Sequence, residues 1–116
     1  MINWSFIDDV SNIETIKEAS FKKPQLIFKH STRCSISSTA KNRLERNWPL
    51  DENQADVHYL DLIRYRDISN HIAVSFNVPH ESPQVLWIQN GECKYDASHF
   101  GINCADFEHL VSAMEM

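Results

Sequence analysis

Cys34 is the residue of this sequence best placed to do chemistry. It lies in the polar stretch KHSTRCSIS, directly after a short apolar run. A thiol at the start of a helix is readily ionised to a nucleophilic thiolate, because free amide groups and the positive end of the helix dipole stabilise the anion. Thiols in comparable positions have pKa values of roughly 3.5 to 7.5, compared with about 8.5 for a free cysteine. Arg33 adds a positive charge beside Cys34, so we interpret Cys34 as an activated nucleophile.

A buried structural role is the ordinary alternative, since a lone cysteine most often behaves as a small hydrophobic residue. The residues at positions 31–33 and 35 are polar, which disfavours deep burial of Cys34. Cys93 and Cys104 have no comparable setting, and we interpret them as structural, with a role in resolving Cys34 as the alternative. Three cysteines without regular spacing predict free thiols in a reducing compartment.

Ser37 stands three residues after Cys34, so Cys-Ser-Ile-Ser is a one-cysteine version of the Cys-x-x-Cys redox motif. A dithiol site releases a mixed disulfide internally, whereas a single thiol depends on a second thiol from solution or from a distant cysteine. The motif therefore favours mixed disulfides with a small thiol over the reduction of protein disulfides.

The composition is that of a single globular domain over residues 1–116. The formal net charge of −5, from 11 basic and 16 acidic residues, leaves no basic stripe for nucleic acid. No stretch approaches the roughly 20 apolar residues of a membrane span, and the N-terminal segment lacks the pattern of a secretion signal. We therefore expect a cytoplasmic protein that binds neither nucleic acid nor membrane.

Hydrophobic periodicity and turn residues predict an alternation of helices and strands. Ser11 and Glu14 have the spacing of a capping box at the start of the first helix. Asn77 should close the third helix, and Asn90-Gly91 is a strong hairpin signal. We predict helices over residues 11–20, 35–48, 67–76 and 105–114, and strands over residues 25–30, 57–62, 84–89 and 92–97, with a weaker strand signal in residues 3–7.

Strands that alternate with helices imply a mostly parallel central sheet with helices on both faces, to which the final hairpin adds an antiparallel edge. This α/β pattern is typical of a thioredoxin-like fold. The second helix should start at or just after Cys34, with the hydroxyls of Ser31, Thr32 and Ser35 as natural caps. Cys34 would then lie beyond the carboxyl end of a parallel strand, where open α/β sheets carry their sites.

Four blocks of the sequence, in order, resemble the monothiol bacilliredoxin family, which comprises thioredoxin-like proteins of the bacillithiol system. These blocks are FKHSTRCSIS, YLDLIRYRDISNHIA, HESPQVLWIQNGE and YDASHFGI, and they cover nearly the whole chain. The family typically carries Cys-Pro-Ile-Ser, whereas this sequence has Ser35 in place of the proline. The replacement keeps the nucleophile and changes the residue that sets the start of the helix.

The resemblance implies that Cys34 takes bacillithiol from an S-bacillithiolated client protein, with bacillithiol as a substrate and no resident cofactor or metal. An X-Pro bond is usually trans, but the resemblance implies that Pro83 is a cis-proline facing Cys34. The backbone of Ser82 would then pair with the substrate. The remaining residues implied for the small-thiol site are Thr32, Arg33, Ser35, Ser37, and the turn with Ser98 and His99, where Arg33 and His99 are candidate partners of carboxylates.

Two other functions remain open at this stage. An iron–sulfur carrier of the monothiol-glutaredoxin type would use Cys34 as a cluster ligand, although the Cys-Gly-Phe-Ser motif of those proteins differs at both middle positions. A metal site of Cys34 with His30, His80 or His99 is a related possibility without regular ligand spacing. A redox-silent interaction module is the second alternative. For His30, a structural role and a role in tuning the thiol are equally compatible with its position.

Overall fold

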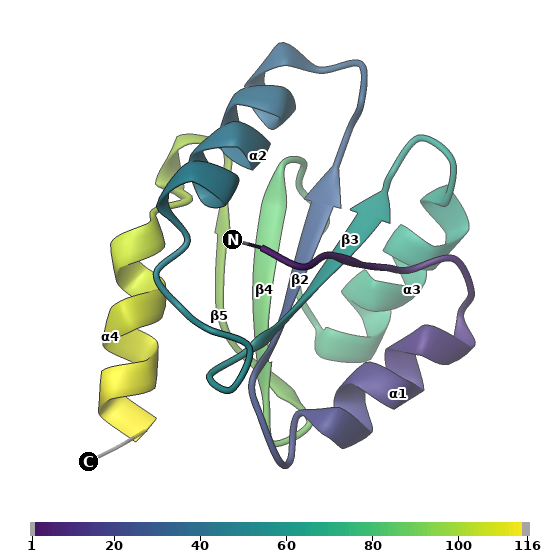
Figure 1. The fold of residues 1–116 in the computed structure, drawn as a ribbon. Helices are drawn as coiled ribbons and strands as arrows, with labels where there is room; N and C mark the ends of the chain where they lie inside the picture. The colour runs from purple at the N-terminus through teal and green to yellow at the C-terminus, as the bar shows by residue number, and fades with distance from the viewer. Residues whose placement is uncertain (1, 115–116) are drawn as a thin grey trace.

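The computed structural model describes residues 2–114, in which β-strands and α-helices alternate along the chain (Figure 1). No helix within residues 2–114 is both long and apolar enough to cross a membrane. The elements in chain order are β1 (Ser5–Phe6), α1 (Ser11–Ala19), β2 (Gln25–His30), α2 (Ser35–Asn47), β3 (Asp56–Asp61), α3 (Arg66–Phe76), β4 (Gln84–Gln89), β5 (Glu92–Ser98), the short 3₁₀ helix η1 (His99–Gly101) and α4 (Cys104–Met114).

The five strands form one sheet in the order β1-β3-β2-β4-β5. β1, β3 and β2 run parallel, whereas β4 is antiparallel to β2 and β5 is antiparallel to β4. The predicted α/β sheet with an antiparallel C-terminal hairpin is therefore confirmed. The register sets Lys29, Gln84 and Ser98 side by side. β2 and β3 thus end, β4 begins and β5 ends at one edge of the sheet, which we call the carboxyl edge.

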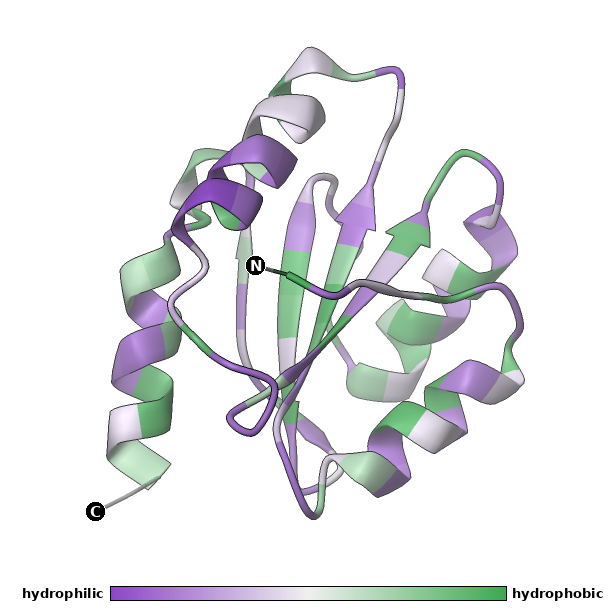
Figure 2. Cartoon of the chain, in the orientation of Figure 1, coloured by the Kyte–Doolittle hydropathy of each residue, from purple (hydrophilic) through white to green (hydrophobic). Residues whose placement is uncertain are grey.

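Apolar residues run along the central strands (Figure 2), and helices cover both faces of the sheet. α2 and α4 cover one face, where the ring of Phe107 stacks on Trp87 with 5.9 Å between centroids. α1 and α3 cover the other face, to which they contribute Ile13, Ile16 and Ile72. Burial of apolar area on both faces is the main favourable term for this fold.

The predicted turn residues adopt the conformations that their positions require. Asn90 and Gly91 have φ angles of 54° and 80°, which a two-residue hairpin turn of this kind needs. A Cβ at Gly91 would lie 2.8 Å from the exposed ring of Phe21, so that this ring would have to shift. Asn77 ends α3 in the left-handed region, with φ 56°. Both turn predictions are confirmed.

The predicted capping box at the first helix is wrong. Val10 is the N-cap of α1, and Ser11 is already helical, with its hydroxyl donating to the carboxylate of Asp9. Oδ1 of Asn12 instead accepts the backbone N–H groups of Asp8 and Asp9, each at 3.0 Å. An amide one residue further along therefore orders the chain that enters α1.

The other boundaries differ from the predicted ones by at most one residue, because local hydrogen bonds rather than periodicity decide where an element ends. The weak strand signal in residues 3–7 corresponds to the two-residue strand β1. The helix η1 was not predicted, since three residues are too few to show a period.

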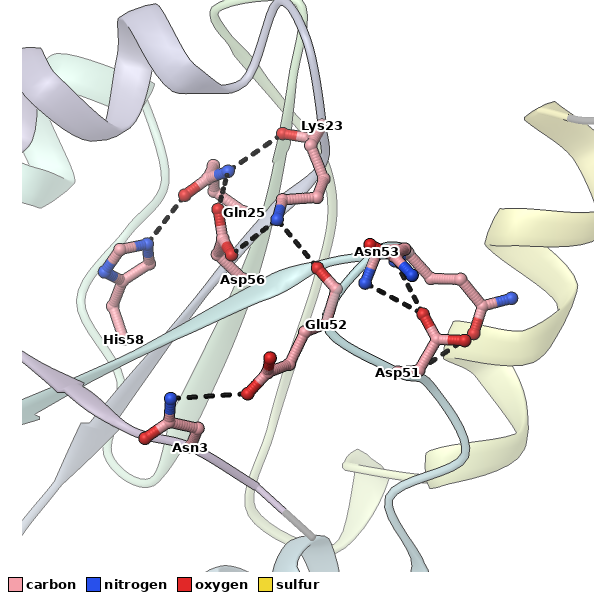
Figure 3. Close-up of polar contacts among 9 residues, drawn as sticks. Asn3, Lys23, Gln25, Asp51, Glu52, Asn53, Asp56 and His58 are labelled. Carbon is pink, nitrogen blue, oxygen red and sulfur yellow. Dashed lines mark hydrogen bonds and ion pairs between the residues drawn. The ribbon is translucent and has the colours of Figure 1, made fainter.

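A polar network closes the opposite end of the sheet, where β2 and β3 begin (Figure 3). Gln25 Nε2 donates to Asp56 Oδ2 at 2.9 Å, and Lys23 Nζ lies 2.9 Å from Asp56 Oδ1. His58 Nε2 lies 2.7 Å from Gln25 Oε1. Burial lowers the pKa of His58 against the opposing effect of the Asp56 charge, so a neutral ring donates to the amide. These contacts tie the two strand starts together, far from the carboxyl edge.

Candidate active site

Cys34 occupies the N-cap position of α2, with an extended backbone at φ −107° and ψ 122°. Its N–H donates to the carbonyl oxygen of Ser31 at 3.1 Å, and its carbonyl oxygen accepts the N–H of Ser38 at 3.0 Å. The side chain is partly exposed and its thiol is free. The first amide groups of a helix have no partner inside that helix, and the side chain of Cys34 makes no cap hydrogen bond with them. The prediction that Cys34 lies at a helix start is confirmed.

α2 begins without a side-chain cap, because Cys34 itself holds the N-cap position. The predicted capping by the hydroxyls of Ser31, Thr32 or Ser35 is therefore wrong. Ser35 is the first helical residue, and Thr32, Arg33 and Ser35 are exposed. These three side chains flank the thiol on the solvent side of the chain, where a substrate can reach them.

Ser37 is fully buried, and its hydroxyl is hydrogen-bonded within the protein. Its Oγ lies 2.6 Å from Nδ1 of His30 and accepts the backbone N–H of Ser31 at 3.0 Å. The hydroxyl of Ser37 is therefore not exposed to a substrate, although the resemblance places this residue in the substrate site. The contact joins the first turn of α2 to the last residue of β2.

His30 is buried against aromatic rings at the end of β2. Its ring lies 5.7 Å from that of Phe28 and 5.6 Å from that of Tyr59, measured between centroids. Burial lowers the pKa of His30, and the charge of Lys41 adds to this effect, while two carboxylates oppose it. The imidazole is consequently neutral near pH 7.

The Ser82–Pro83 peptide bond is cis, as the resemblance implies. Pro83 is buried, and its carbonyl oxygen accepts the N–H of His99 at 3.0 Å. The hydroxyl oxygen of Ser82 is buried without a hydrogen-bond partner among the described residues. Because β4 pairs with β2, this loop lies beside the end of β2, from which the chain continues to Cys34.

Ser98 and His99 lie at the carboxyl edge, where β5 ends and η1 begins. Ser98 pairs with Gln84 in the sheet, and His99 begins η1 with a left-handed backbone at φ 54°. His99 Nε2 lies 3.7 Å from Glu81 Oε2. η1 also contacts α2, alongside which it is drawn in Figure 1. The fold therefore gathers Ser98 and His99 with Pro83 at the edge where the helix of Cys34 starts.

The four residues considered for a metal site do not form one. His30 lies on the sheet face that α2 covers, whereas His80 lies on the α3 face, with Nδ1 3.2 Å from Ser69 Oγ and 3.5 Å from Lys29 Nζ. Within residues 2–114 no cluster of three or more histidine, cysteine, aspartate or glutamate side chains could hold a metal ion. A ligand set of Cys34 with these histidines is therefore not assembled.

Cys93 and Cys104 are held in different surroundings from Cys34. Cys93 lies on β5 near the hairpin turn, and its thiol donates to the carbonyl oxygen of Tyr95 at 3.3 Å. Burial raises the pKa of Cys93 to about 11. Cys104 begins α4 with its sulfur 3.8 Å from the carbonyl oxygen of Arg43, and burial raises its pKa as well. Both thiols are therefore less ionised at neutral pH than a free cysteine.

Two residues near the carboxyl edge were not predicted from the sequence. Lys29 is fully buried, and burial, with a further contribution from Arg66, lowers its pKa to about 8. The signal was a lysine inside the otherwise buried strand QLIFKH. Phe100 of η1 is 76% exposed, which no local pattern indicates. Phe100 adds an apolar surface beside the site, and Lys29 adds a buried positive charge behind it.

Comparisons with known proteins agree with this geometry. A profile of the family described as monothiol bacilliredoxin BrxC matches residues 5–107. A solved structure described as a candidate oxidoreductase with a thioredoxin fold is similar over 91% of each chain, at 29% identity and a TM-score of 0.79. Thioredoxin from Malassezia sympodialis is similar over 100% of this chain and 94% of its own, at 10% identity and a TM-score of 0.74. A mutant thioredoxin from Halobacterium salinarum is similar over 96% and 89%, at 13% identity and a TM-score of 0.68.

Proposed function

The chain belongs to the monothiol bacilliredoxin family of thiol oxidoreductases with the thioredoxin fold, and we propose that it removes bacillithiol from S-bacillithiolated client proteins. Bacillithiol enters this reaction as a substrate, so no resident cofactor is required. The exchange needs free thiols and therefore belongs to a reducing compartment such as the cytoplasm.

The observation that carries the proposal is a lone thiol at the start of a helix, with no second thiol beside it. Cys34 is partly exposed at the N-cap of α2, and the residue three positions later is Ser37. Such a thiol must exchange with another molecule to complete a cycle. A small-thiol mixed disulfide on a protein is the substrate that suits this requirement.

In the first step, the thiolate of Cys34 attacks the bacillithiol sulfur of the client's mixed disulfide. A disulfide forms between Cys34 and bacillithiol, the bond between bacillithiol and the client breaks, and the client cysteine leaves as a thiolate that takes up a proton from water. The amide groups at the start of α2 stabilise the attacking thiolate, and Arg33 is the nearest positive charge in the sequence.

In the second step, a reducing thiol restores the enzyme. Its thiolate attacks the bacillithiol sulfur, so that Cys34 is released and a new disulfide forms between bacillithiol and the reductant. Cys93 lies at the end of β5 remote from the carboxyl edge, and burial raises the pKa of both Cys93 and Cys104, which makes each a slower nucleophile at neutral pH. The second thiol therefore comes from another molecule.

The polar groups around the thiol suit a small anionic thiol. Thr32 and Arg33 are exposed on one side of Cys34, and Ser98 and His99 approach the carboxyl edge from β5. We assign Arg33 and His99 to the carboxylates of bacillithiol, since cationic donors form strong hydrogen bonds with carboxylates. Glu81 competes for His99 at 3.7 Å, so Arg33 is the stronger of the two partners.

The peptide of the client needs a separate contact. Ser82 lies just before β4 at the carboxyl edge, beside the end of β2. An extended client segment would pair with Ser82 in the manner of an added strand. This arrangement would align the client's mixed disulfide with Cys34.

The test is the intact mass of the protein after incubation with a client that carries bacillithiol. Wild type should gain one bacillithiol while the client loses its own, and Cys34→Ser should gain none. Cys93→Ser and Cys104→Ser should transfer like wild type. The same client carrying glutathione measures the preference between the two small thiols.

A lack of transfer by folded wild type would overturn the proposal. The next measurement would then be the visible absorption of protein purified without oxygen, which reports an iron–sulfur cluster on Cys34. A colourless, inactive and folded protein would leave an interaction module as the remaining function.

A further inference from the structure

Ser37 takes the position that a resolving cysteine holds in a two-cysteine site, but its hydroxyl is buried in hydrogen bonds with other residues of the protein. The side chain of Ser37 is 0% exposed and that of its partner His30 is 5% exposed. Ser37 Oγ lies 2.6 Å from His30 Nδ1 and 3.0 Å from the backbone nitrogen of Ser31. No other side chain of the first turn of α2 is tied to β2 in this way among the described residues.

The direction of the two hydrogen bonds follows from the groups involved. A backbone N–H can only donate, so the oxygen of Ser37 accepts from Ser31. His30 Nδ1 is the other polar partner of this hydroxyl among residues 2–114, so we assign the hydroxyl proton to the bond with Nδ1. This assignment places the ring proton on Nε2. Burial lowers the pKa of His30, which agrees with a neutral acceptor. Stacking on Phe28 at 5.7 Å fixes the plane of the ring.

The pair closes a loop that contains the nucleophile. His30 is the last residue of β2 and Ser37 lies in the first turn of α2, and between them Cys34 is held only by backbone bonds to Ser31 and Ser38. A loosened first turn would disorder the N-terminal end of α2, where Cys34 lies. The position of the sulfur therefore depends on a contact made by neither Cys34 nor its immediate neighbours.

We propose that His30 and Ser37 form a positioning pair, which holds the first turn of α2 against β2 so that Cys34 stays at the N-terminal end of the helix. The pair acts through the helix and does not touch the substrate. The inference rests on the proposed function in one respect, namely that Cys34 is the attacking thiol.

The test is the pH profile of Cys34 alkylation by iodoacetamide, measured by peptide mass in wild type and in Ser37→Ala. The midpoint of the profile should move up by about one pH unit in the variant, so that the rate at neutral pH falls by about tenfold. Above both midpoints the two proteins should react at the same rate, because every thiol is then ionised.

Ser69→Ala is the matched control. Ser69 is also 0% exposed, and its hydroxyl lies 3.2 Å from Nδ1 of a histidine, His80, but on the opposite face of the sheet. Both variants lose a buried serine hydroxyl that contacts a histidine ring, and this contact is buried at Ser37 and partly buried at Ser69. An unchanged Cys34 profile in Ser69→Ala is expected, and an equal shift in both variants would overturn the proposal as general loosening.

A second pair of variants keeps the proposal testable if Ser37→Ala fails to fold. His30→Asn keeps an acceptor near the place of Nδ1 but loses most of the ring packing, whereas His30→Leu keeps apolar volume but loses the acceptor. His30→Asn should retain the wild-type profile, and His30→Leu should shift it. The opposite pattern would show that packing alone matters and would refute the pair.

Alkylation uses no bacillithiol, so its result is independent of the proposed reaction. Wild type that transfers no bacillithiol while Ser37→Ala still shifts the alkylation profile would refute the function and leave the pair intact. Transfer by wild type with identical alkylation profiles in every variant would support the function and refute the pair.

Discussion

The backbone N–H of His99 donates a hydrogen bond to the carbonyl oxygen of Pro83, with 3.0 Å between nitrogen and oxygen. This bond joins the end of β5 to the cis-proline loop before β4. His99 has a left-handed backbone, with φ 54°, and the next residue, Phe100, is 76% exposed. An aromatic side chain on a turn that is anchored at the site offers an apolar contact to a bound client.

Phe100→Ser should therefore slow the removal of bacillithiol from a protein client by about threefold to tenfold, since aromatic anchors carry much of the binding energy of an interface. The rate with the small disulfide of bacillithiol should stay within twofold, because that substrate lacks the client surface. Steady-state kinetics with the two substrates measures the difference. Val74→Ser, at a residue of α3 that is 82% exposed, is the control. Equal losses with both substrates would assign Phe100 to the small-thiol pocket instead.

The three thiols should differ in their rates of alkylation. Burial raises the pKa of Cys93 to about 11 and raises that of Cys104. A raised pKa leaves less thiolate at neutral pH, so iodoacetamide should label Cys34 first, by at least about tenfold. Peptide masses after timed labelling give the three rates, and labelling in denaturant is the control in which the rates converge. Similar rates in the folded protein would contradict an activated Cys34.

Ser35→Pro should restore the family's proline without harm. Ser35 is the first residue of α2, where the N–H has no helical partner, and Cys34 already has the extended backbone that precedes proline. The free energy of unfolding should rise by about 0.4–1 kcal/mol, through a less flexible unfolded chain. Ser38→Pro is the contrasting control, because it removes the bond to Cys34 and should cost about 3 kcal/mol. Urea unfolding measures both, and a loss of stability in Ser35→Pro would refute this account of the helix start.

Lys29→Met should stabilise the protein most at neutral pH. Burial lowers the pKa of Lys29 from 10.5 in the unfolded chain to about 8. At pH values below 8 the amine is charged in both states, and burying this charge reduces the free energy of unfolding. A pKa difference of this size corresponds to about 3 kcal/mol, which is an upper limit for the gain at pH 7. The gain should shrink as the pH rises from about 8 to about 10.5, where the unfolded chain also loses the proton.

Urea unfolding of both proteins at several pH values measures this difference, and Lys22→Met, at an exposed lysine, should show no such trend. The difference between variants isolates Lys29 from the tyrosines and cysteines that titrate in the same range. A gain that stays constant from pH 7 to pH 10 would contradict a buried charge at Lys29.

Local patterns were sufficient to predict most of the elements. The four-residue spacing of apolar side chains located α2, and Asn90-Gly91 located the final hairpin, because both signals depend on neighbours in the chain. Boundaries and caps were less predictable. At Ser11, for example, the backbone N–H and the hydroxyl both donate to the carboxylate of Asp9 instead of forming the expected box with Glu14.

The side-chain partners at the carboxyl edge could not be predicted in the same way. Lys29 and His30 are adjacent in the sequence, but they point to opposite faces of the sheet, where Lys29 contacts His80 of the loop before β4 and His30 contacts Ser37 of α2. That alternation follows from strand geometry, whereas the identity of the partners depends on which helix covers each face. Ser37 was accordingly expected beside the substrate, but it lies on the buried face of α2, in contact with His30 of β2.

The sequence by itself determined that one thiol, Cys34, lies between a buried strand and a helix, because strand and helix periods and polar flanks are properties of neighbouring residues. Only the tertiary structure decided that Pro83 and His99 come together at that edge, that Ser37 is bonded to His30, and that Lys29 is buried beside His80. The reason is that these contacts join residues distant in the chain, and they exist only once sheet register and helix packing bring those residues within hydrogen-bonding distance.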